Sequence, residues 1–171
     1  MEYVIDKNIT VRFAHENESG IILQFIKELA EFEKLPDHVT ATQELIHKSI
    51  FINKRAEVLF CEYKHEIVGF ALFFHNYSTF LAKPGLYLED LYVKPEFRSR
   101  GIGMSFFNVL SKIARERNCG RIEWWCLNWN KKAIDFYLKL GAKAMDEWIV
   151  YRVTEDKFDT LEKKTEPALP A

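Results

Sequence analysis

Hydrophobic positions recur along this chain at two spacings. In residues 19–35 they fall three or four residues apart, which is the spacing of one helix face, and Pro36 ends the run. The segments with this helical spacing are 19–35, 42–50, 103–118 and 130–141. The segments with the length and composition of strands are 10–13, 56–63, 67–74, 86–93, 121–127 and 147–153.

The order of these elements indicates the fold class. It reads strand, two helices, three strands, helix, strand, helix, strand. Residues 64–66 suit a hairpin turn, whereas the later alternation of strands and helices requires crossover connections and some parallel pairing. No repeat or linker interrupts the pattern. We therefore expect one α/β domain over residues 1–171, with a charged, proline-containing tail that frays after about residue 161.

Composition narrows the class of protein. Of the 171 residues 48% are hydrophobic and 15% are aromatic, which supports a folded core. A net charge of -1 is unlike a general nucleic-acid binder, so no nucleic-acid partner is expected. The first residues lack the basic and apolar regions of an export signal, and no apolar run is long enough to span a bilayer. We expect a cytoplasmic protein without a membrane segment.

Cysteine and histidine are sparse. The 3 cysteines form no C-x-x-C pair, which disfavours a disulfide framework and a zinc site. The 5 histidines are scattered without ligand spacing, so no metal is expected.

The connection between the fourth predicted strand and the third predicted helix has the residues of an anion site. Gly101 and Gly103 stand where the helix begins, so unpaired backbone N–H groups and the positive end of the helix dipole face the loop. Glycine lets a bulky anion approach this backbone, and Arg98 and Arg100 add positive charge. Phosphate is commonly held in this way. A glycine-rich turn with solvated arginines is the alternative.

Other phosphate-binding motifs fit less well. A Walker loop needs G-x-x-x-x-G-K-[ST], and no such run is present. A dinucleotide-binding fingerprint needs a third glycine, but Phe106 occupies that position. Phosphotransfer on a nucleotide is therefore disfavoured.

The same turn resembles a known family. Residues 98–103 read Arg-Ser-Arg-Gly-Ile-Gly, which is similar to the R/Q-x-x-G-x-G/A motif of the GNAT acetyltransferase superfamily. The likeness covers roughly residues 10–153 and is strongest to the diamine acetyltransferase branch, which includes spermidine/spermine and thialysine acetyltransferases. Outside the turn, the similar positions are Tyr87 to Val93, Trp129, Asn130, Phe136, Tyr137, Gly141 and Ala142.

The resemblance implies a GNAT fold, with a mixed, mostly antiparallel central sheet that splays at the cofactor site and helices on both faces. It also implies acetyl-CoA as the cosubstrate and a homodimer. Residues 91–93 would bind the pantetheine arm and residues 99–104 the pyrophosphate, while Asn130 would contact the cofactor, cap a helix, or both. The expected cofactor-binding residues are Leu91, Tyr92, Val93, Arg98, Ser99, Arg100, Gly101, Ile102, Gly103, Met104, Asn130, Lys132 and Ala133.

Two residues have catalytic roles by this resemblance. Tyr137 would be the acid that protonates the leaving thiolate, although a tyrosine on a helix is often only a core residue. Glu89 would be the base that removes a proton from the amine, directly or through water, and a structural salt bridge is its alternative role. Strand alternation places Asp90 on the opposite face, as a structural or solvent-facing residue.

The acceptor is expected to be an amine, because the remaining matched positions are acidic and aromatic. Phe32 and Glu33 stand where the polyamine enzymes have a tyrosine–glutamate pair, and Glu147 and Glu89 complete the expected substrate-binding set. These charges would also suit a solvated helix face. A small diamine or polyamine, or a lysine-like amino acid such as thialysine, is the first hypothesis. An amine on a protein or peptide is the second, and a CoA-binding regulatory module without turnover is the third.

Overall fold

The computed structural model describes residues 1–163. The chain forms two compact units, one from Met1 to Trp125 and one from Cys126 onward, and each is described by itself. The expectation of a single domain stays a prediction, and the expected frayed tail lies largely in residues 164–171, outside the described residues.

A six-stranded mixed sheet forms the centre of the first unit. Its order follows the sequence, with antiparallel pairing from β1 to β5 and one parallel pair between β5 and β6. The mostly antiparallel sheet with one parallel pair confirms the fold class expected from the sequence. The strands are β1 (Glu2–Val4), β2 (Ile9–Phe13), β3 (Glu57–Tyr63), β4 (Glu66–Ser78), β5 (Lys83–Val93) and β6 (Ile122–Trp124).

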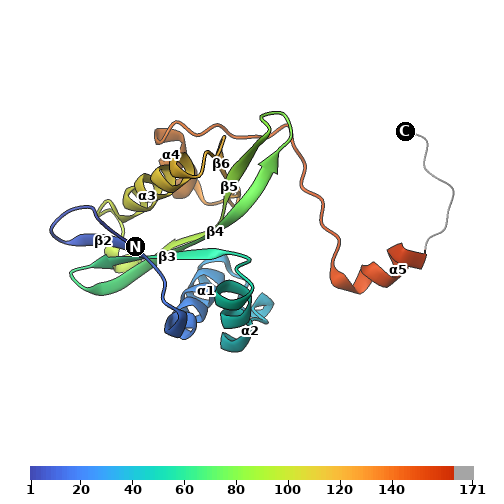
Figure 1. Ribbon diagram of the computed structural model, residues 1–171, viewed down its shortest axis with the longest axis horizontal. Helices are drawn as coiled ribbons and strands as arrows, with labels where there is room; N and C mark the ends of the chain where they lie inside the picture. The colour runs from blue at the N-terminus through green and yellow to red at the C-terminus, as the bar shows by residue number, and fades with distance from the viewer. Residues whose placement is uncertain (164–171) are drawn as a thin grey trace. The chain divides into compact units, whose positions relative to one another are not determined.

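Helices cover both faces of this sheet. Figure 1 shows α1 and α2 below the strands and α3 above them. The helix α1 (Ser19–Glu33) ends where Lys34 takes a left-handed conformation at φ 65°, and α2 (Gln43–His47) continues into a π-helical turn (Lys48–Ile52). On the other face α3 (Ile102–Glu116) packs on β2, β3 and β5. The short 3-10 helices of this unit are Glu16–Glu18, Pro36–His38 and Pro95–Phe97.

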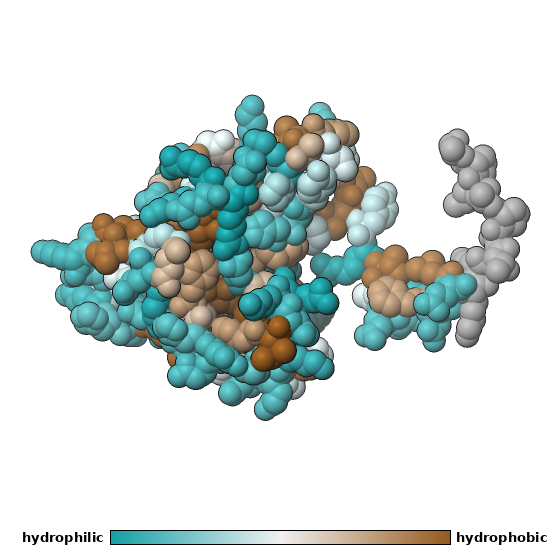
Figure 2. Space-filling model, in the orientation of Figure 1, coloured by the Kyte–Doolittle hydropathy of each residue, from teal (hydrophilic) through white to brown (hydrophobic). Residues whose placement is uncertain are grey.

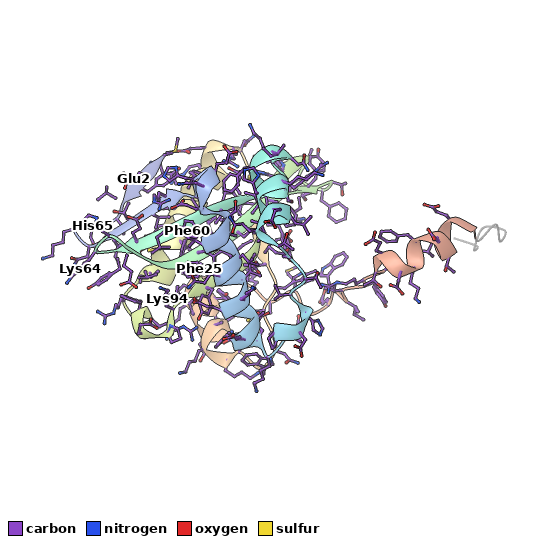
Figure 3. The ribbon with its side chains drawn as sticks, turned by 90° about the horizontal axis from the view of Figure 1, so that it is seen from below. Glu2, Phe25, Phe60, Lys64, His65 and Lys94 are labelled. Carbon is purple, nitrogen blue, oxygen red and sulfur yellow. The ribbon has the colours of Figure 1, made fainter. Side chains whose placement is uncertain are left out.

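Aromatic side chains fill the core between α1 and the sheet. The ring of Phe25 lies 5.9 Å from that of Phe60, 5.4 Å from that of Phe70 and 6.2 Å from that of Tyr92, measured between centroids. Phe25 and Phe60 lie side by side in Figure 3. A fully buried phenylalanine contributes about 1.5–3 kcal/mol to stability, so this group holds α1 against β3, β4 and β5.

The hairpin of β4 and β5 is longer than the sequence predicts. The predicted strands covered residues 67–74 and 86–93, but Ser78 pairs with Lys83 and only residues 79–82 connect the strands. This end of the hairpin reaches beyond β3 and carries polar residues. It therefore lacks the hydrophobic pattern by which a strand is recognised. The hairpin turn expected at residues 64–66 is present, with Tyr63 paired to Glu66.

The second unit contains α4 (Lys131–Lys139), a 3-10 helix (Glu155–Lys157) and α5 (Phe158–Lys163). The predicted helix over residues 130–141 is confirmed by α4. The predicted strand over residues 147–153 is wrong, because this segment has no secondary structure. Its β-branched and aromatic residues favour an extended backbone, but a strand also needs a hydrogen-bonded neighbour, and the described residues supply none there.

The surface visible in Figure 2 is mainly hydrophilic, and its hydrophobic patches are separated from one another. Among residues 1–163, none of the helices has both the length and the apolar character that crossing a bilayer requires.

Candidate functional site

The sheet opens between β5 and β6. The parallel pairing joins only Leu86, Leu88 and the residue between them to β6, and the N–H of Leu86 donates to the carbonyl of Arg121 at 3.0 Å. The strand β5 continues to Val93 without β6 beside it. Among the described residues no strand pairs with this edge at residues 89–93, although the carbonyl of Val93 accepts a hydrogen bond from the Nε of Arg98 at 2.8 Å. The pairing thus ends where the sheet is expected to splay.

A β-bulge on β5 determines which backbone groups face this edge. Leu72 of β4 pairs with Asp90 and Phe73 with Leu88, so Glu89 is the extra residue.

Beyond the bulge the N–H of Lys94 donates to the carbonyl of Val68 at 2.9 Å. The backbone N–H and C=O groups of successive residues point to alternate sides of a strand. Those of Tyr92 therefore point to β4, like those of Lys94, whereas those of Leu91 and Val93 point to the open edge. An extended ligand could pair there as an added strand.

The turn before α3 leaves its backbone accessible. Gly101 precedes the helix at φ 84°, and a Cβ built on it would meet no atom within 4 Å. The first helical bond joins the N–H of Ser105 to the carbonyl of Gly101 at 2.9 Å. The N–H groups of the first helical residues, Ile102, Gly103 and Met104, therefore have no acceptor inside the helix.

No side chain caps this helix, and its first turn has no acidic residue. The positive end of the dipole of a 15-residue helix is thus uncompensated by the chain. Ser99 has a left-handed conformation at φ 62°, which lets the chain turn sharply in front of the helix. The observed turn has the backbone geometry of an anion site.

The two arginines of the turn lie against aromatic rings. The guanidinium carbon of Arg98 is 4.8 Å from the ring centre of Phe32 and 5.5 Å from that of Tyr92, and its Nε donates to the carbonyl of Val93 at 2.8 Å.

The guanidinium carbon of Arg100 is 5.4 Å from the ring centre of Tyr63 and 5.9 Å from that of Phe97. Lys64 also lies near the Tyr63 ring, with its Nζ 5.6 Å from the ring centre. Figure 3 shows Lys64 and His65 at the turn between β3 and β4. Positive charge therefore gathers around the turn before α3.

Three carboxylates lie near one another at the α1 side of β5. Glu89 is exposed at the bulge, whereas Asp90 is half-buried. Burial first, and then the negative charges of Glu89 and Glu33, raise the pKa of Asp90 to about 7. Burial also raises the pKa of Glu33, the last residue of α1. A cationic group placed among these carboxylates would lower the free energy of their ionised forms.

Sequence reasoning missed the environment of Asp90. It expected Glu89 to be the carboxylate in the buried strand and Asp90 to be structural or solvent-facing, but the structure exposes Glu89 and buries much of Asp90. The bulge is the reason, because it interrupts the alternation on which the expectation depended. Two adjacent acids in an otherwise apolar strand were the available signal.

The remaining candidate residues belong to the second unit. The Oδ1 of Asn130 accepts a hydrogen bond from the N–H of Ala133 at 3.3 Å, which confirms its role as a helix cap. Tyr137 is half-buried on α4, with its ring 5.5 Å from that of Phe136. Lys132 and Glu147 are exposed. Their expected roles toward cofactor and substrate stay predictions.

The sequence matches a known family over most of its length. The model of the Acetyltransferase (GNAT) family matches residues 23–142. A thialysine N-epsilon-acetyltransferase of Bos taurus is 35% identical over 156 residues, covering 84% of this chain and 91% of the relative. An L-ornithine N5-acetyltransferase of Arabidopsis thaliana is 39% identical over 97 residues, covering 57% of this chain and 42% of the relative.

Solved structures share the fold at lower identity. An integron cassette protein from V. cholerae superposes with a TM-score of 0.76 at 21% identity, covering 92% of this chain and 99% of the other. An aminoglycoside acetyltransferase from an uncultured soil metagenomic sample gives 0.74 at 19% identity, covering 88% and 99%. The chain belongs to the GNAT acetyltransferase family, in the branch that contains the thialysine and spermidine/spermine acetyltransferase sequences.

Proposed function

We propose that the protein transfers an acetyl group from acetyl-CoA to a primary amine of a small molecule, either a diamine or polyamine or a lysine-like amino acid such as thialysine. The single observation that carries this proposal is the open turn at Gly101, where the first N–H groups of α3 have no acceptor inside the helix, no side chain caps the helix, and a Cβ built on Gly101 meets no atom within 4 Å.

The chain has the features that acetyl-CoA requires. The diphosphate would be held by the backbone of residues 99–104 and by the charge of Arg98 and Arg100. The pantetheine arm would pair with Leu91 and Val93 at the open edge of β5. In this proposal Asn130, Lys132 and Ala133 complete the cofactor-binding residues from the start of α4.

The acceptor amine would be held by carboxylates. Glu33, Glu89 and Asp90 offer negative charge at the α1 side of β5. Because the pKa of Asp90 is raised, a cation bound nearby would stabilise its ionised form. Phe32 would contact the apolar stem of the acceptor, and Glu147 is proposed to contribute from the second unit. The relatives named for thialysine and L-ornithine support an acceptor with an amine on a short chain.

The proposed chemistry needs one base and one acid. An ammonium group has no lone pair, so Glu89, directly or through water, accepts its proton. The neutral nitrogen then forms a bond to the thioester carbonyl carbon. The carbon–sulfur bond breaks, and the hydroxyl of Tyr137 donates its proton to the thiolate. The nitrogen then releases its second proton to water, Tyr137 takes up a proton from water, and Glu89 returns the first proton to solvent.

Acetyl transfer is tested by thiol release. The purified protein would be assayed with acetyl-CoA and a panel of thialysine, L-ornithine, spermidine and a lysine-containing peptide. We expect saturable thiol release with at least one of the small amines. Release with the peptide alone would favour a protein acetyltransferase, and saturable acetyl-CoA binding without release on any amine would favour a regulatory module. The cytoplasmic location and the homodimer are further parts of the proposal.

A further inference from the structure

One side chain joins the two halves of the proposed site. Arg98 lies three residues before Gly101, at the start of the turn proposed to hold the diphosphate. Its guanidinium carbon is 4.8 Å from the ring centre of Phe32, on the last turn of α1, and 5.5 Å from that of Tyr92 on β5. These contacts span from the turn to the proposed acceptor side.

The third contact fixes the orientation of this arginine. Its Nε donates to the carbonyl of Val93 at 2.8 Å, at the end of the open edge of β5. This hydrogen bond holds the guanidinium plane in one orientation relative to the rings of Phe32 and Tyr92. A displacement of residues 93–98 therefore moves the surface on which Phe32 rests.

The contact partners have distinct proposed roles. Phe32 precedes Glu33, whose carboxylate is proposed to hold the amine, and α1 ends at Glu33 because Lys34 is left-handed. Val93 belongs to the edge proposed to bind the pantetheine arm. The residues that contact Arg98 thus come from the acceptor side and from the cofactor side, whereas the aromatic rings beside Arg100 belong to residues outside α1.

We propose that Arg98 is a positioning residue that couples the two substrates, so that acetyl-CoA bound at the turn fixes Phe32 and Glu33 in the arrangement that binds the amine. This inference rests on the function proposed above and goes beyond it. Coupling of binding is reciprocal, so the amine must strengthen acetyl-CoA binding by the same factor. An arginine that served only as a charge for phosphate would produce no such coupling.

The chain offers a matched control. Arg100 is two residues away and also stacks on aromatic rings, but its partners are Tyr63 and Phe97, neither of which belongs to α1. Arg98→Gln and Arg100→Gln therefore remove the same charge from the same turn, and only the first breaks the link to Phe32. Arg98→Lys keeps the charge but loses the planar group and the Nε donor.

The experiment is calorimetric titration of the full-length protein with thialysine, in the absence and in the presence of saturating CoA. In the wild type we expect CoA to tighten thialysine binding about fivefold or more. In Arg98→Gln and Arg98→Lys this factor falls to within about twofold of unity, whereas Arg100→Gln weakens CoA binding and keeps the factor. Thermal unfolding of each variant shows whether it is folded.

A variant at the other end of the contact tests the proposal without changing the turn. Phe32→Leu should also reduce the coupling, and the double variant Phe32→Leu with Arg98→Gln should lose no more than Arg98→Gln alone. The result for Phe32→Leu alone tests the proposal even if an Arg98 variant fails to fold.

Two results would overturn it. Coupling that survives in Arg98→Lys and in Phe32→Leu would make Arg98 a charge for the diphosphate and nothing more. Binding of both ligands to the wild type without any coupling would also refute the inference, while leaving the proposed function intact. If CoA does not bind to the wild type at all, the proposed function itself fails and this inference falls with it.

Discussion

Adjacent residues on β5 have opposite environments. Glu89 is exposed at the bulge, and Asp90 is half-buried, near enough to Glu33 at the end of α1 to be influenced by its charge. The pKa of Asp90 is raised from 3.8 to about 7, first by burial and then by the charges of Glu89 and Glu33. The bulge thus produces a carboxyl group that changes charge near neutral pH, where an amine substrate is cationic.

The raised pKa of Asp90 predicts how stability depends on pH. Because its folded value of about 7 exceeds the ordinary 3.8, the folded state holds a proton that the unfolded state has lost, and stability falls as pH rises between these values. Asp90→Asn removes this loss. We expect the variant to exceed the wild type in unfolding free energy by roughly 2–4 kcal/mol at pH 8 and to match it near pH 4.

Denaturant unfolding of both proteins at several pH values measures this difference. The same variant should lower kcat/KM for the amine, because a neutral amide cannot pair with a cation. A stability difference that does not change with pH would contradict the assigned environment of Asp90.

Tyr137 gives a second prediction at the residue scale. If its hydroxyl protonates the leaving thiolate, Tyr137→Phe should lower kcat by about a hundredfold and leave both KM values within about twofold. The ring remains, so the contact with Phe136 and the stability of α4 should be kept. Steady-state kinetics with acetyl-CoA and thialysine test this. An unchanged kcat across pH 6–9 would show that another group supplies the proton.

The start of α3 is the element on which cofactor binding depends. Gly101 has φ 84° and open space where a Cβ would be. Gly101→Ala should destabilise the protein by about 1–2 kcal/mol, because an alanine is strained in this conformation. It should also raise the KM for acetyl-CoA about tenfold, a loss of about 1.4 kcal/mol, since the new methyl group occupies the space proposed for the diphosphate.

Gly141 provides the matched control. It has φ 85°, and again no atom lies within 4 Å of a built Cβ, but it follows α4. Gly141→Ala should lower the unfolding free energy to a similar extent without the tenfold change in KM for acetyl-CoA. Equal effects of both variants on KM would show that strain, and not the open turn, controls binding.

The elements could be predicted from sequence where their pattern is local. The glycine turn before α3 and the cap at Asn130 depend on neighbouring residues only, so their signals were readable. The bulge at Glu89 depends on how β4 and β5 pair, and the contacts of Arg98 depend on where α1 ends over the sheet. Neither can be read from the spacing of a single segment, so the half-buried environment of Asp90 could not be predicted from the sequence.

At the scale of the whole molecule, the order of elements predicted some parallel pairing, but it missed the first strand, β1, which pairs with β2. The one parallel pair, β5 with β6, lies where a helix connects consecutive strands, as the crossover rule requires. The strand predicted over residues 147–153 is absent, because that prediction considered only the residues of the segment and not its neighbours. Its residues have high β propensity, but propensity does not provide a pairing partner.

The expected homodimer predicts the mass in solution. Large apolar side chains remain exposed in both units, including Phe80 at 94% and Tyr151 at 87%, and burying such residues favours association. Light scattering after size-exclusion chromatography should give about twice the chain mass of 20.2 kDa at micromolar concentration. A mass of one chain over the whole concentration range would contradict the homodimer.

The account depends most on the backbone of the turn before α3 holding a diphosphate. The direct measurement is the amide ¹H–¹⁵N spectrum during titration with acetyl-CoA and, separately, with S-acetylpantetheine, which lacks the diphosphate. We predict that the amide signals of Ile102, Gly103 and Met104 shift with acetyl-CoA and stay in place with S-acetylpantetheine. Saturable acetyl-CoA binding that leaves these three signals unmoved would contradict the account.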